Sequence, residues 1–426
     1  MLTEAITSIV PATSTSSAAT TPQLSRNQPI YDWYVMPEAY SAPLVQEAIR
    51  EFEVPAGGMV LDPFCGTGTT LVASRPMGRN ALGIEVNPFL AFASQVKSGI
   101  YDSSLLRLEV THLLEAARDT FNRMESDGEV QWTLTGDLPQ MPRLDRWIAR
   151  RVVWKVLALK RCIEESVSES VRDVPMLALA SILRGASNMK LTPHAFGSRE
   201  VKQDSPVLTM FETRIQKMLA DIEWLEEQEG LGDAHVVEGD IRDISTFAYD
   251  GAPVNLAVTS PPYLNNLDYT MQTRLELFFL GFVSDMEELK LLRKRMMICD
   301  AKATYKDIED WKRVQDVASV EGIAKEIDEK LGDRGWGWDY GLMTRQYFGG
   351  LLRAMESIKE MLAPGASLLM VLGDSAHSGV HVPVTTIAEE LGHIAGFCGS
   401  EVRVLRTRRA SSHGFKLDES AVVLRR

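Results

Sequence analysis

The fold of this chain is decided by Met59-Val60-Leu61-Asp62-Pro63-Phe64-Cys65-Gly66-Thr67-Gly68-Thr69-Thr70. Its first four residues have the composition of a buried strand, a turn with two glycines follows, and the sequence from Leu71 onward predicts a helix. Glycines such as Gly66 and Gly68 let backbone N–H groups approach a ligand closely at the N-terminus of a helix. The stretch therefore predicts a strand, a ligand-binding turn and a helix of an α/β sheet.

The ligand expected at this turn is not a phosphate. A Walker loop needs a lysine before Ser or Thr, and none precedes Thr69-Thr70. A dinucleotide fingerprint needs a third glycine, where this chain has Leu71. Asp62 would repel an anion but suits the ammonium group of a methionine-like ligand. A strand-turn-helix that binds nothing remains the alternative.

Two further predicted strands also end in acidic residues. Residues 81–88 form an apolar strand in which Glu85 lies at the spacing where nucleoside-binding folds hold a ribose. Residues 234–240 form another, and Asp240 at its end can accept a hydrogen bond from an adenine amine. Each acid alone is typical of an ordinary strand end or helix cap. Together with the glycine turn, the three acids indicate a site for an adenosine-methionine cation.

A second motif, Thr259-Ser260-Pro261-Pro262-Tyr263, follows the predicted strand 254–258. Two successive prolines fix the backbone and remove two donors, so the neighbouring carbonyls are free to accept from an exocyclic amine. The Ser260 hydroxyl can also accept, and the Tyr263 ring offers a face on which a base can stack. A strand followed by a simple Pro-Pro turn is the alternative. The motif indicates an enzyme that methylates a nucleobase.

These two motifs resemble those of the amino-methylating DNA methyltransferases, which use S-adenosylmethionine to modify cytosine N4 or adenine N6. Residues 62–70 resemble the cofactor loop of the family, and residues 260–263 resemble its catalytic tetrad. Residues 31–45 are similar to the segment that closes over the methionine end of the cofactor. Further segments that resemble the family are residues 264–269 after the tetrad, 362–374 as the fifth strand, and 401–426 as a closing antiparallel hairpin.

The resemblance implies a fold and a set of site residues. The fold is α/β, a Rossmann-like S-adenosylmethionine methyltransferase sheet, mostly parallel, with an antiparallel C-terminal hairpin and helical insertions. The implied catalytic residues are Ser260, Pro261, Pro262 and Tyr263. The predicted cofactor-binding residues are Tyr34, Pro37, Asp62, Pro63, Phe64, Cys65, Gly66, Thr67, Gly68, Thr69, Glu85, Val86, Asn87, Asp240 and Ile241, and no metal is predicted.

Serine at the first tetrad position is similar to the cytosine-N4 members, whereas aspartate is usual in the adenine-N6 members. The sequence therefore favours a site-specific DNA cytosine-N4 methyltransferase, with a role in restriction-modification or phage defence and a restriction endonuclease as a candidate partner. Hydrogen bonds from the amine to Ser260 and a proline carbonyl are expected to free its lone pair for the methyl group. A target in duplex DNA must flip out to reach them. The alternatives are adenine-N6 methylation of DNA, methylation of an RNA base amine, and a non-catalytic binding subunit.

The cofactor loop precedes the tetrad by nearly two hundred residues, an order that departs from many SPPY enzymes. Two long insertions interrupt the cofactor-binding frame, and target recognition is expected across both. The first has helical periodicity over residues 105–124, 144–168, 175–189 and 207–228. The predicted parts are a disordered arm (1–28), the cofactor-binding part of the core (29–102), a helical insertion (103–232), the catalytic part (233–282), a second insertion with the aromatic stretch 335–340 (283–344), and the C-terminal part of the core (345–426).

Composition fits a cytoplasmic enzyme. The 426 residues are 45% hydrophobic, and no apolar run has membrane-spanning length, so no membrane partner is expected. The four cysteines, at positions 65, 162, 299 and 398, lie too far apart for a CxxC metal motif. His377 and His381 lack a third ligand.

The net charge of −13 is unfavourable for a DNA-binding protein, because phosphate contacts dominate affinity. Three local clusters of basic residues offset it. Arg143, Arg146 and Arg150 are spaced to share one helix face, and the other clusters span residues 290–295 and 403–409. A solvated surface is the ordinary interpretation of any one cluster. With three, at least one phosphate-contacting surface is expected.

Overall fold

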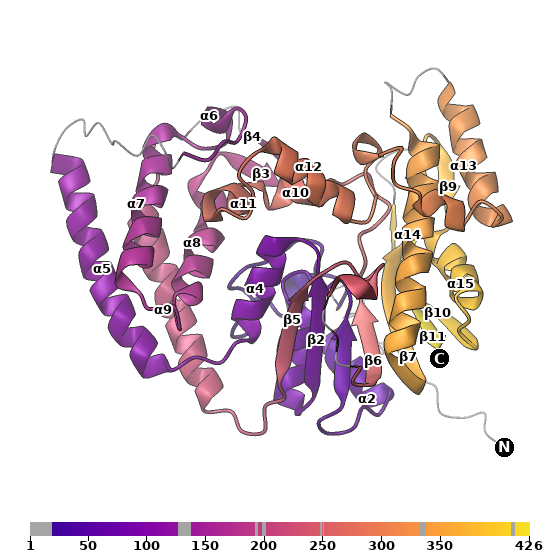
Figure 1. The fold of residues 1–426 in the computed structure, drawn as a ribbon, viewed down its shortest axis with the longest axis horizontal. Coiled ribbons are helices and arrows are strands. Elements are labelled where there is room, and N and C mark those ends of the chain that lie inside the picture. The colour runs from indigo at the N-terminus through magenta and orange to yellow at the C-terminus, as the bar shows by residue number, and fades with distance from the viewer. Residues whose placement is uncertain are drawn as a thin grey trace.

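A seven-stranded sheet forms the centre of the protein, in the order β10-β11-β7-β6-β1-β2-β5 (Figure 1). The computed structural model describes residues 19–126, 138–191, 195–197, 202–247, 249, 251–332, 338–409 and 414–426. Neighbouring strands from β7 to β5 run parallel, whereas β11 is antiparallel to both β7 and β10. The predicted mostly parallel sheet with an antiparallel C-terminal hairpin is therefore confirmed. The strands are β1 (Met59–Asp62), β2 (Asn80–Glu85), β5 (Ala234–Glu238), β6 (Val254–Thr259), β7 (Leu362–Gly373), β10 (Gly399–Arg409) and β11 (Lys416–Arg425).

Helices cover both faces of this sheet. Because successive side chains of a strand point to opposite faces, Val60 of β1 packs with α2 (Ala42–Glu51), while Leu61 packs in the core that includes α14 (Tyr340–Met361) and α15 (Val384–Ile394). Burying both faces explains why β6 and β7 are nearly continuous apolar runs rather than alternating ones. The connections α3 (Thr69–Ser74) and α4 (Pro88–Ser98) follow β1 and β2.

The strand order reverses at β1, which places a ligand crevice there. The chain runs from β1 to β2 and β5 on one side, and then returns to β6 on the other side of β1. In open α/β sheets, ligands bind at the carboxyl ends of the strands where the order reverses. Asp62 ends β1 and Thr259 ends β6, so the two sequence motifs both begin at this point.

The first insertion forms a helical layer beside the β5 edge of the sheet (Figure 1). Its helices build an apolar core together with α4. They are α5 (Ser103–Ser126), α6 (Leu144–Trp147), α7 (Arg150–Ser166), α8 (Asp173–Ala186) and α9 (Val207–Glu226), with a small sheet of β3 (Met189–Leu191) and β4 (Ala195–Gly197). Within the described ranges, the helices are too short or too polar to span a bilayer.

The expectation of one helix over residues 144–168 is wrong. Ile148 is extended and fully buried, and it separates α6 from α7. The break is held by a 2.7 Å hydrogen bond from the Asn188 backbone N–H to the Trp147 carbonyl. Arg143 adopts the left-handed conformation before α6, so it does not share one continuous helix face with Arg150.

The second insertion lies above the carboxyl ends of the central strands in the view of Figure 1. It follows α10 (Tyr269–Gln272) and α11 (Arg274–Leu280). Of the predicted aromatic stretch, residues 335–337 lie outside the described residues. The elements of this region are α12 (Met286–Arg295), η4 (Ala301–Ala303), η5 (Asp310–Arg313) and α13 (Ala318–Leu331), and the hairpin β8 (Ser375–His377) and β9 (Val380–Val382) follows β7.

The predicted arm extends too far into the folded chain. Residues 1–18 lie outside the described residues, but residues 19–28 are folded against the core and include η1 (Pro22–Leu24). Ala19 and Ser25 are buried, and Ser25 accepts a 2.8 Å hydrogen bond from the backbone of Ala42 at the start of α2. Composition alone did not reveal this docking, because Ser and Thr are typical of disordered segments.

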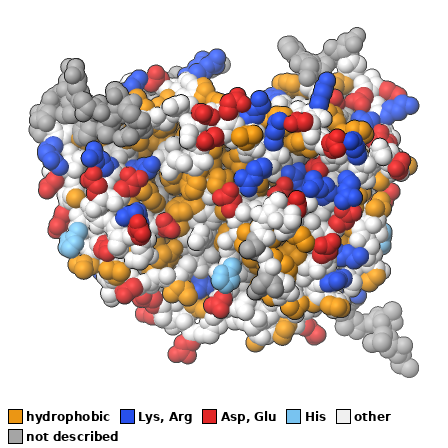
Figure 2. Space-filling view, in the orientation of Figure 1, with side chains coloured by type: hydrophobic (Ala, Val, Ile, Leu, Met, Phe, Trp, Pro, Cys, Tyr) orange, Lys and Arg blue, Asp and Glu red, His pale blue; other side chains and the backbone are white. Residues whose placement is uncertain are grey.

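Basic side chains gather on one half of the face in Figure 2, over the segments between α12 and α14, where acidic side chains are interleaved with them. Many of these cations are paired. Lys294 contacts Asp307 at 2.6 Å, and Arg313 contacts Glu356 at 2.8 Å. In the third cluster, Arg403 bridges Glu51 and Glu401. Phosphate contact by any of the three clusters stays a prediction.

Candidate active site

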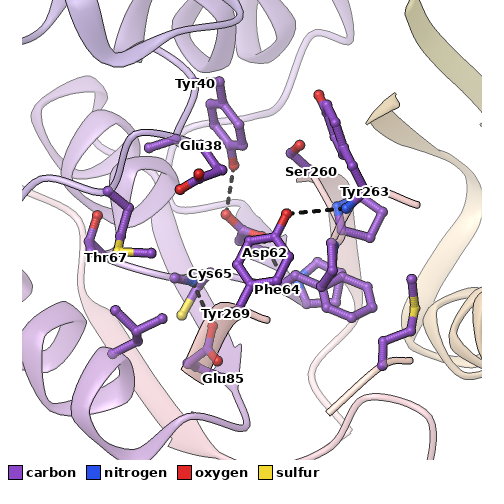
Figure 3. Close-up of a pocket in the computed structure, with 18 of the residues that line it drawn as sticks. Glu38, Tyr40, Asp62, Phe64, Cys65, Thr67, Glu85, Ser260, Tyr263 and Tyr269 are labelled. Carbon is purple, nitrogen blue, oxygen red and sulfur yellow. Dashed lines mark hydrogen bonds between the residues drawn. The ribbon is translucent and has the colours of Figure 1, made fainter. Parts of the chain in front are cut away.

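A cavity of about 330 Å³ opens at the carboxyl ends of the central parallel strands, within the size range of small-molecule sites. Figure 3 shows Thr67 and Glu85 on one side of Asp62, and Ser260 and Tyr263 on the other. The structure thus brings both sequence motifs to one cavity. The predicted residues that line it are Pro37, Asp62, Pro63, Phe64, Cys65, Gly66, Thr67, Thr69, Glu85, Val86, Asp240, Ile241, Ser260, Pro261, Pro262 and Tyr263.

Three predicted cofactor residues do not line the cavity. Tyr34 is buried, and its hydroxyl donates to Glu276 at 2.9 Å. Gly68 is the N-cap of α3 with a φ of 80°, and a Cβ there would lie 2.5 Å from the Ser94 hydroxyl. Asn87 is fully buried and caps α4 through its side-chain oxygen. These residues shape the elements around the cavity rather than its wall.

Asp62 joins the segments that surround the cavity. Its Oδ1 accepts hydrogen bonds from the Thr259 hydroxyl at 2.7 Å and from the Phe64 N–H at 3.2 Å. Its Oδ2 accepts from the hydroxyls of Tyr40 at 2.6 Å and Thr70 at 2.7 Å. Burial raises the pKa of this carboxyl, and the hydrogen bonds oppose that change. Four donors already occupy the acceptor sites of Asp62. Its arrangement therefore disfavours the direct contact with a ligand ammonium that the sequence suggested.

Glu85 keeps acceptor capacity at the other side of the cavity. Its Oε2 accepts from the Gly66 N–H at 2.9 Å, and its Oε1 accepts from the Asn87 N–H at 2.8 Å. Each carboxylate oxygen can accept a second hydrogen bond. The contact with Gly66 also holds the turn, whose glycine has a φ of 50° and free space where a Cβ would stand. A ligand with paired hydroxyls fits these two oxygens.

The buried Glu85 makes stability depend on pH. Burial raises its pKa to about 7 from an ordinary 4.5. Between these values the folded protein holds a proton that the unfolded chain releases, so the free energy of unfolding falls as pH rises through this window. We expect wild type to lose up to about 3 kcal/mol relative to Glu85→Gln over that range. Urea unfolding of both proteins at pH 4.5, 6 and 7.5 measures this difference. If the free energies of unfolding of the two proteins changed in parallel with pH, the raised pKa of Glu85 would be contradicted.

Asp240 is held in place by a buried arginine. Arg242 donates to it from its backbone N–H at 3.0 Å and from its guanidinium at 2.7 to 3.1 Å. The same guanidinium contacts the buried Asp310 at 2.9 Å, and Arg353 contacts Asp310 at 2.6 Å. Because Arg242 is only 7% exposed, it fixes the direction of the Asp240 carboxylate at the cavity wall. The sequence indicated Asp240 as a site residue, but it did not indicate that Arg242 orients this carboxylate.

Ser260 is oriented as a hydrogen-bond acceptor toward the cavity. Its hydroxyl donates its single proton to the Val371 carbonyl of β7 at 3.1 Å. The oxygen lone pairs therefore remain for a donor that enters the cavity. The adjacent Thr259 donates to Asp62, which ties the start of the tetrad to the loop after β1.

Tyr263 is fixed from three sides. Its hydroxyl donates to the buried Glu419 at 3.1 Å, and Glu419 also accepts from Arg406 at 2.6 Å. Its backbone N–H donates to the Tyr269 hydroxyl at 3.3 Å, as Figure 3 shows. Its ring packs on Gly373, where a Cβ would lie 3.1 Å from the ring. A ring held in this way is preorganised to stack on a planar ligand.

Several cavity residues were not predicted from the sequence. Glu38 accepts from Gln272 at 2.8 Å through one oxygen, and its own backbone N–H also donates to its carboxylate. Its place one residue after Pro37, in the segment that resembles the methionine-binding one, was the available signal. Glu419 and Arg408 carry no local motif. Other unpredicted lining residues are Met36, Tyr40, Asn265, Tyr269, Arg242 and Arg406.

Cys65 of the cofactor loop and His377 of β8 both lie in buried surroundings. Cys65 is buried, and burial raises the pKa of its thiol well above the ordinary value. His377 is buried and contacts the Leu264 carbonyl at 3.0 Å. Among the described residues, no group of three or more potential metal ligands is close enough to hold an ion.

Comparison with known proteins identifies matching sequences along most of the chain. A family model described as DNA methylase matches residues 19–95. The chain is 24% identical over 427 residues to the Type II methyltransferase M.BsoBI of Geobacillus stearothermophilus, covering 92% of this chain and 83% of that protein. It is 20% identical over 373 residues to M.MvaI of Kocuria varians, covering 83% and 79%.

A shorter match has a higher sequence identity. The chain is 35% identical over 78 residues to the Type II methyltransferase M.MjaII of Methanocaldococcus jannaschii, which covers 18% of this chain and 14% of that protein. The family model spans Glu38, Asp62 and Glu85, so its match includes one wall of the cavity. The longer matches extend over most of the chain, insertions included.

Proposed function

This chain belongs to the amino-methylating DNA methyltransferases, and we propose from that premise that it transfers a methyl group from S-adenosylmethionine to the exocyclic N4 of cytosine in DNA. One observation carries the proposal. The 2.7 Å hydrogen bond from Thr259 to Asp62 fixes the Ser-Pro-Pro-Tyr tetrad against the glycine turn, so an amine acceptor and a nucleoside-sized cavity adjoin. Serine at position 260 supports cytosine, rather than adenine, as the target base.

The described residues fit the methyl donor, which when bound supplies the electrophilic methyl group. Glu85 keeps acceptor capacity beyond its backbone contacts, and the two ribose hydroxyls can donate to it. Asp240 accepts from three N–H groups of Arg242, which leaves its carboxylate room for one further donor, the adenine amine. Glu38 is exposed in the cavity and has fewer internal donors than the fully occupied Asp62, so it suits the ammonium group better.

The target amine would be held by Ser260 and by a carbonyl beside the two prolines. An exocyclic amine is a weak nucleophile, because its lone pair is delocalised into the ring. Because the Ser260 hydroxyl donates to Val371, its oxygen is placed to accept from the target amine and to draw one amine proton out of the ring plane. Tyr263 stacks on the base, and positioning in a dry pocket accounts for most of the rate gain. The amine loses its proton to water after transfer.

Methyl transfer from labelled S-adenosylmethionine tests the activity. Full-length protein is incubated with mixed-sequence duplex DNA, single-stranded DNA and RNA of matched length, and label in each polymer is counted. We expect label in DNA. Label confined to RNA would support the RNA alternative, and no label in any polymer across varied sequences would support a non-catalytic binding role.

We also place target recognition across residues 103–232 and 283–344. The second insertion carries Trp338, which is 36% exposed, with the Lys302 ammonium 4.6 Å from its ring centre. Its neighbour Tyr340 receives a 3.5 Å hydrogen bond from Asn266, next to the cavity residue Asn265. An exposed aromatic ring beside a cation, linked to the tetrad loop, suits stacking on bases near the flipped one.

Trp338→Ala is expected to weaken binding of substrate DNA by about 10-fold, because base stacking contributes roughly 1–3 kcal/mol. Fluorescence anisotropy with labelled duplex measures the affinity. Trp224→Ala is the matched control, since Trp224 is 39% exposed on α9 and does not line the cavity. Equal DNA affinities for the two variants would contradict a contact by Trp338.

A restriction-modification role follows from the relatives, several of which are named Type II methyltransferases. We propose that this chain protects one DNA sequence from a cognate endonuclease. Genomic DNA from cells that express the protein should then carry the modification in a single sequence context. Modification spread over unrelated contexts would contradict that role.

A further inference from the structure

A second cavity, of about 300 Å³, lies between the sheet and the helical layer. Its walls come from residues 28–31, from α2 and α3, from the short η2 (Arg75–Met77), from α4, and from α9 of the helical insertion. It shares no lining residue with the candidate active site, so the proposed function does not account for it.

Two buried basic side chains, Lys97 and Arg75, line this second cavity, and no Asp or Glu does. Lys97 is 2% exposed, and its ammonium has only long contacts, 3.3 Å to the Tyr31 carbonyl and 3.5 Å to the Tyr34 carbonyl. Arg75 is 3% exposed and donates to the carbonyls of Gly232 and Ser98. Among the described residues, neither cation has a carboxylate within ion-pair distance.

The missing counter-charge is unusual in a chain with a net charge of −13. Burial lowers the pKa of Lys97 to about 7. The carboxylate that attracts Lys97 from a distance and opposes this change is Asp32, which is already contacted by Lys217 and Arg214. Buried charges are normally paired, and an ammonium can donate three hydrogen bonds. Lys97 therefore has capacity for a strong acceptor that enters the cavity.

The rest of the wall is largely apolar. Val72 of α3, Leu225 of α9 and the ring of Trp224 line the cavity with Ile30. An inorganic anion would leave these surfaces uncovered, whereas an apolar chain or ring would remove them from water at about 25 cal/mol per Å². The wall thus combines a cationic end with an apolar body.

We propose that this second cavity binds a small organic carboxylate, with its anionic head on Lys97 and its apolar body against Val72 and Trp224. The ligand would touch α3, whose first turn belongs to the cofactor loop, and α9 of the helical layer. It would therefore brace the helical insertion against the sheet.

Octanoate is the test probe, with octylamine and octanol as tail-matched controls. Isothermal titration calorimetry on the full chain should detect octanoate, and octylamine and octanol should bind at least about 10-fold more weakly, because a charge-assisted hydrogen bond contributes about 1.5–3 kcal/mol. Lys97→Met keeps the apolar stem and should weaken octanoate by a similar factor. Lys325→Met, on α13 with a side chain that is 76% exposed and outside the second cavity, should leave octanoate binding unchanged. S-adenosylhomocysteine should not compete.

If Lys97→Met does not fold, as judged by circular dichroism, Trp224→Ala serves instead and should also weaken octanoate. The proposal is overturned if wild type does not bind octanoate at millimolar concentration, or if the folded variant binds it unchanged. It is also overturned if octylamine or inorganic phosphate binds equally well, or if S-adenosylhomocysteine displaces octanoate.

Discussion

Ser260→Ala is expected to slow methyl transfer by roughly 100-fold while cofactor affinity stays near normal. The variant removes the acceptor that faces the cavity and leaves the Thr259 contact with Asp62 in place. Single-turnover methylation of a DNA duplex gives the rate, and titration with S-adenosylhomocysteine gives the affinity.

The control for this substitution is Ser284→Ala, because Ser284 is exposed and does not line the cavity. It should leave both the rate and the affinity unchanged. If Ser260→Ala lowered the rate and the affinity by the same factor, Ser260 would be part of the cofactor site rather than the acceptor for the target amine.

Asp62→Ala is expected to lower the free energy of unfolding by about 3 kcal/mol and to abolish measurable cofactor binding. The substitution removes the shared acceptor of four donors, and three of them, the hydroxyls of Tyr40, Thr70 and Thr259, come from different segments. The loop after β1 then loses its attachment to β6. Urea unfolding and calorimetric titration with S-adenosylhomocysteine measure the two effects.

Glu38→Gln separates the positioning role of Asp62 from direct contact with the cofactor. Because Gln272 is the side-chain partner of Glu38 and a glutamine oxygen can still accept from it, the variant should keep wild-type stability. It should weaken cofactor binding by about 10-fold, because a hydrogen bond to a charged acceptor is lost. Loss of stability in Glu38→Gln, or normal cofactor affinity in Asp62→Ala, would reverse the two roles.

The sheet was predictable because its signals are local. Met59 to Asp62 forms β1 with the predicted bounds, and residues 254–258 differ from β6 by one residue. Short apolar runs that end in an acid or in proline are read from a few neighbouring residues. The meeting of the two motifs also follows from topology, since the carboxyl ends of parallel strands share one edge.

The helical insertion was predicted less accurately, for a physical reason. Residues 144–168 have helical periodicity throughout, but the chain breaks at Ile148 because tertiary packing buries that side chain and Asn188 satisfies the Trp147 carbonyl. Periodicity cannot register a partner forty residues away. The same limit explains why Arg143 and Arg150 do not lie on one helix.

Among the site residues too, those with a local sequence signal were predicted and those without one were not. The acids at the ends of strands were found, whereas three other residues were not. Arg242 is held by Asp310, Glu419 accepts from Tyr263, and Glu38 accepts from Gln272, and each of these partners lies in a distant segment. Tyr34 was expected at the cofactor, but its hydroxyl is directed to Glu276 of α11, which the sequence of its own segment cannot indicate.

Mass spectrometry of the modified nucleoside shows directly whether the methyl group is placed on cytosine N4. DNA methylated by the full chain is digested to nucleosides and compared with standards. We expect N4-methylcytosine, and roughly 100-fold less of it with Ser260→Ala at the same early reaction time. N6-methyladenine as the product would contradict the inference drawn from serine at the head of the tetrad.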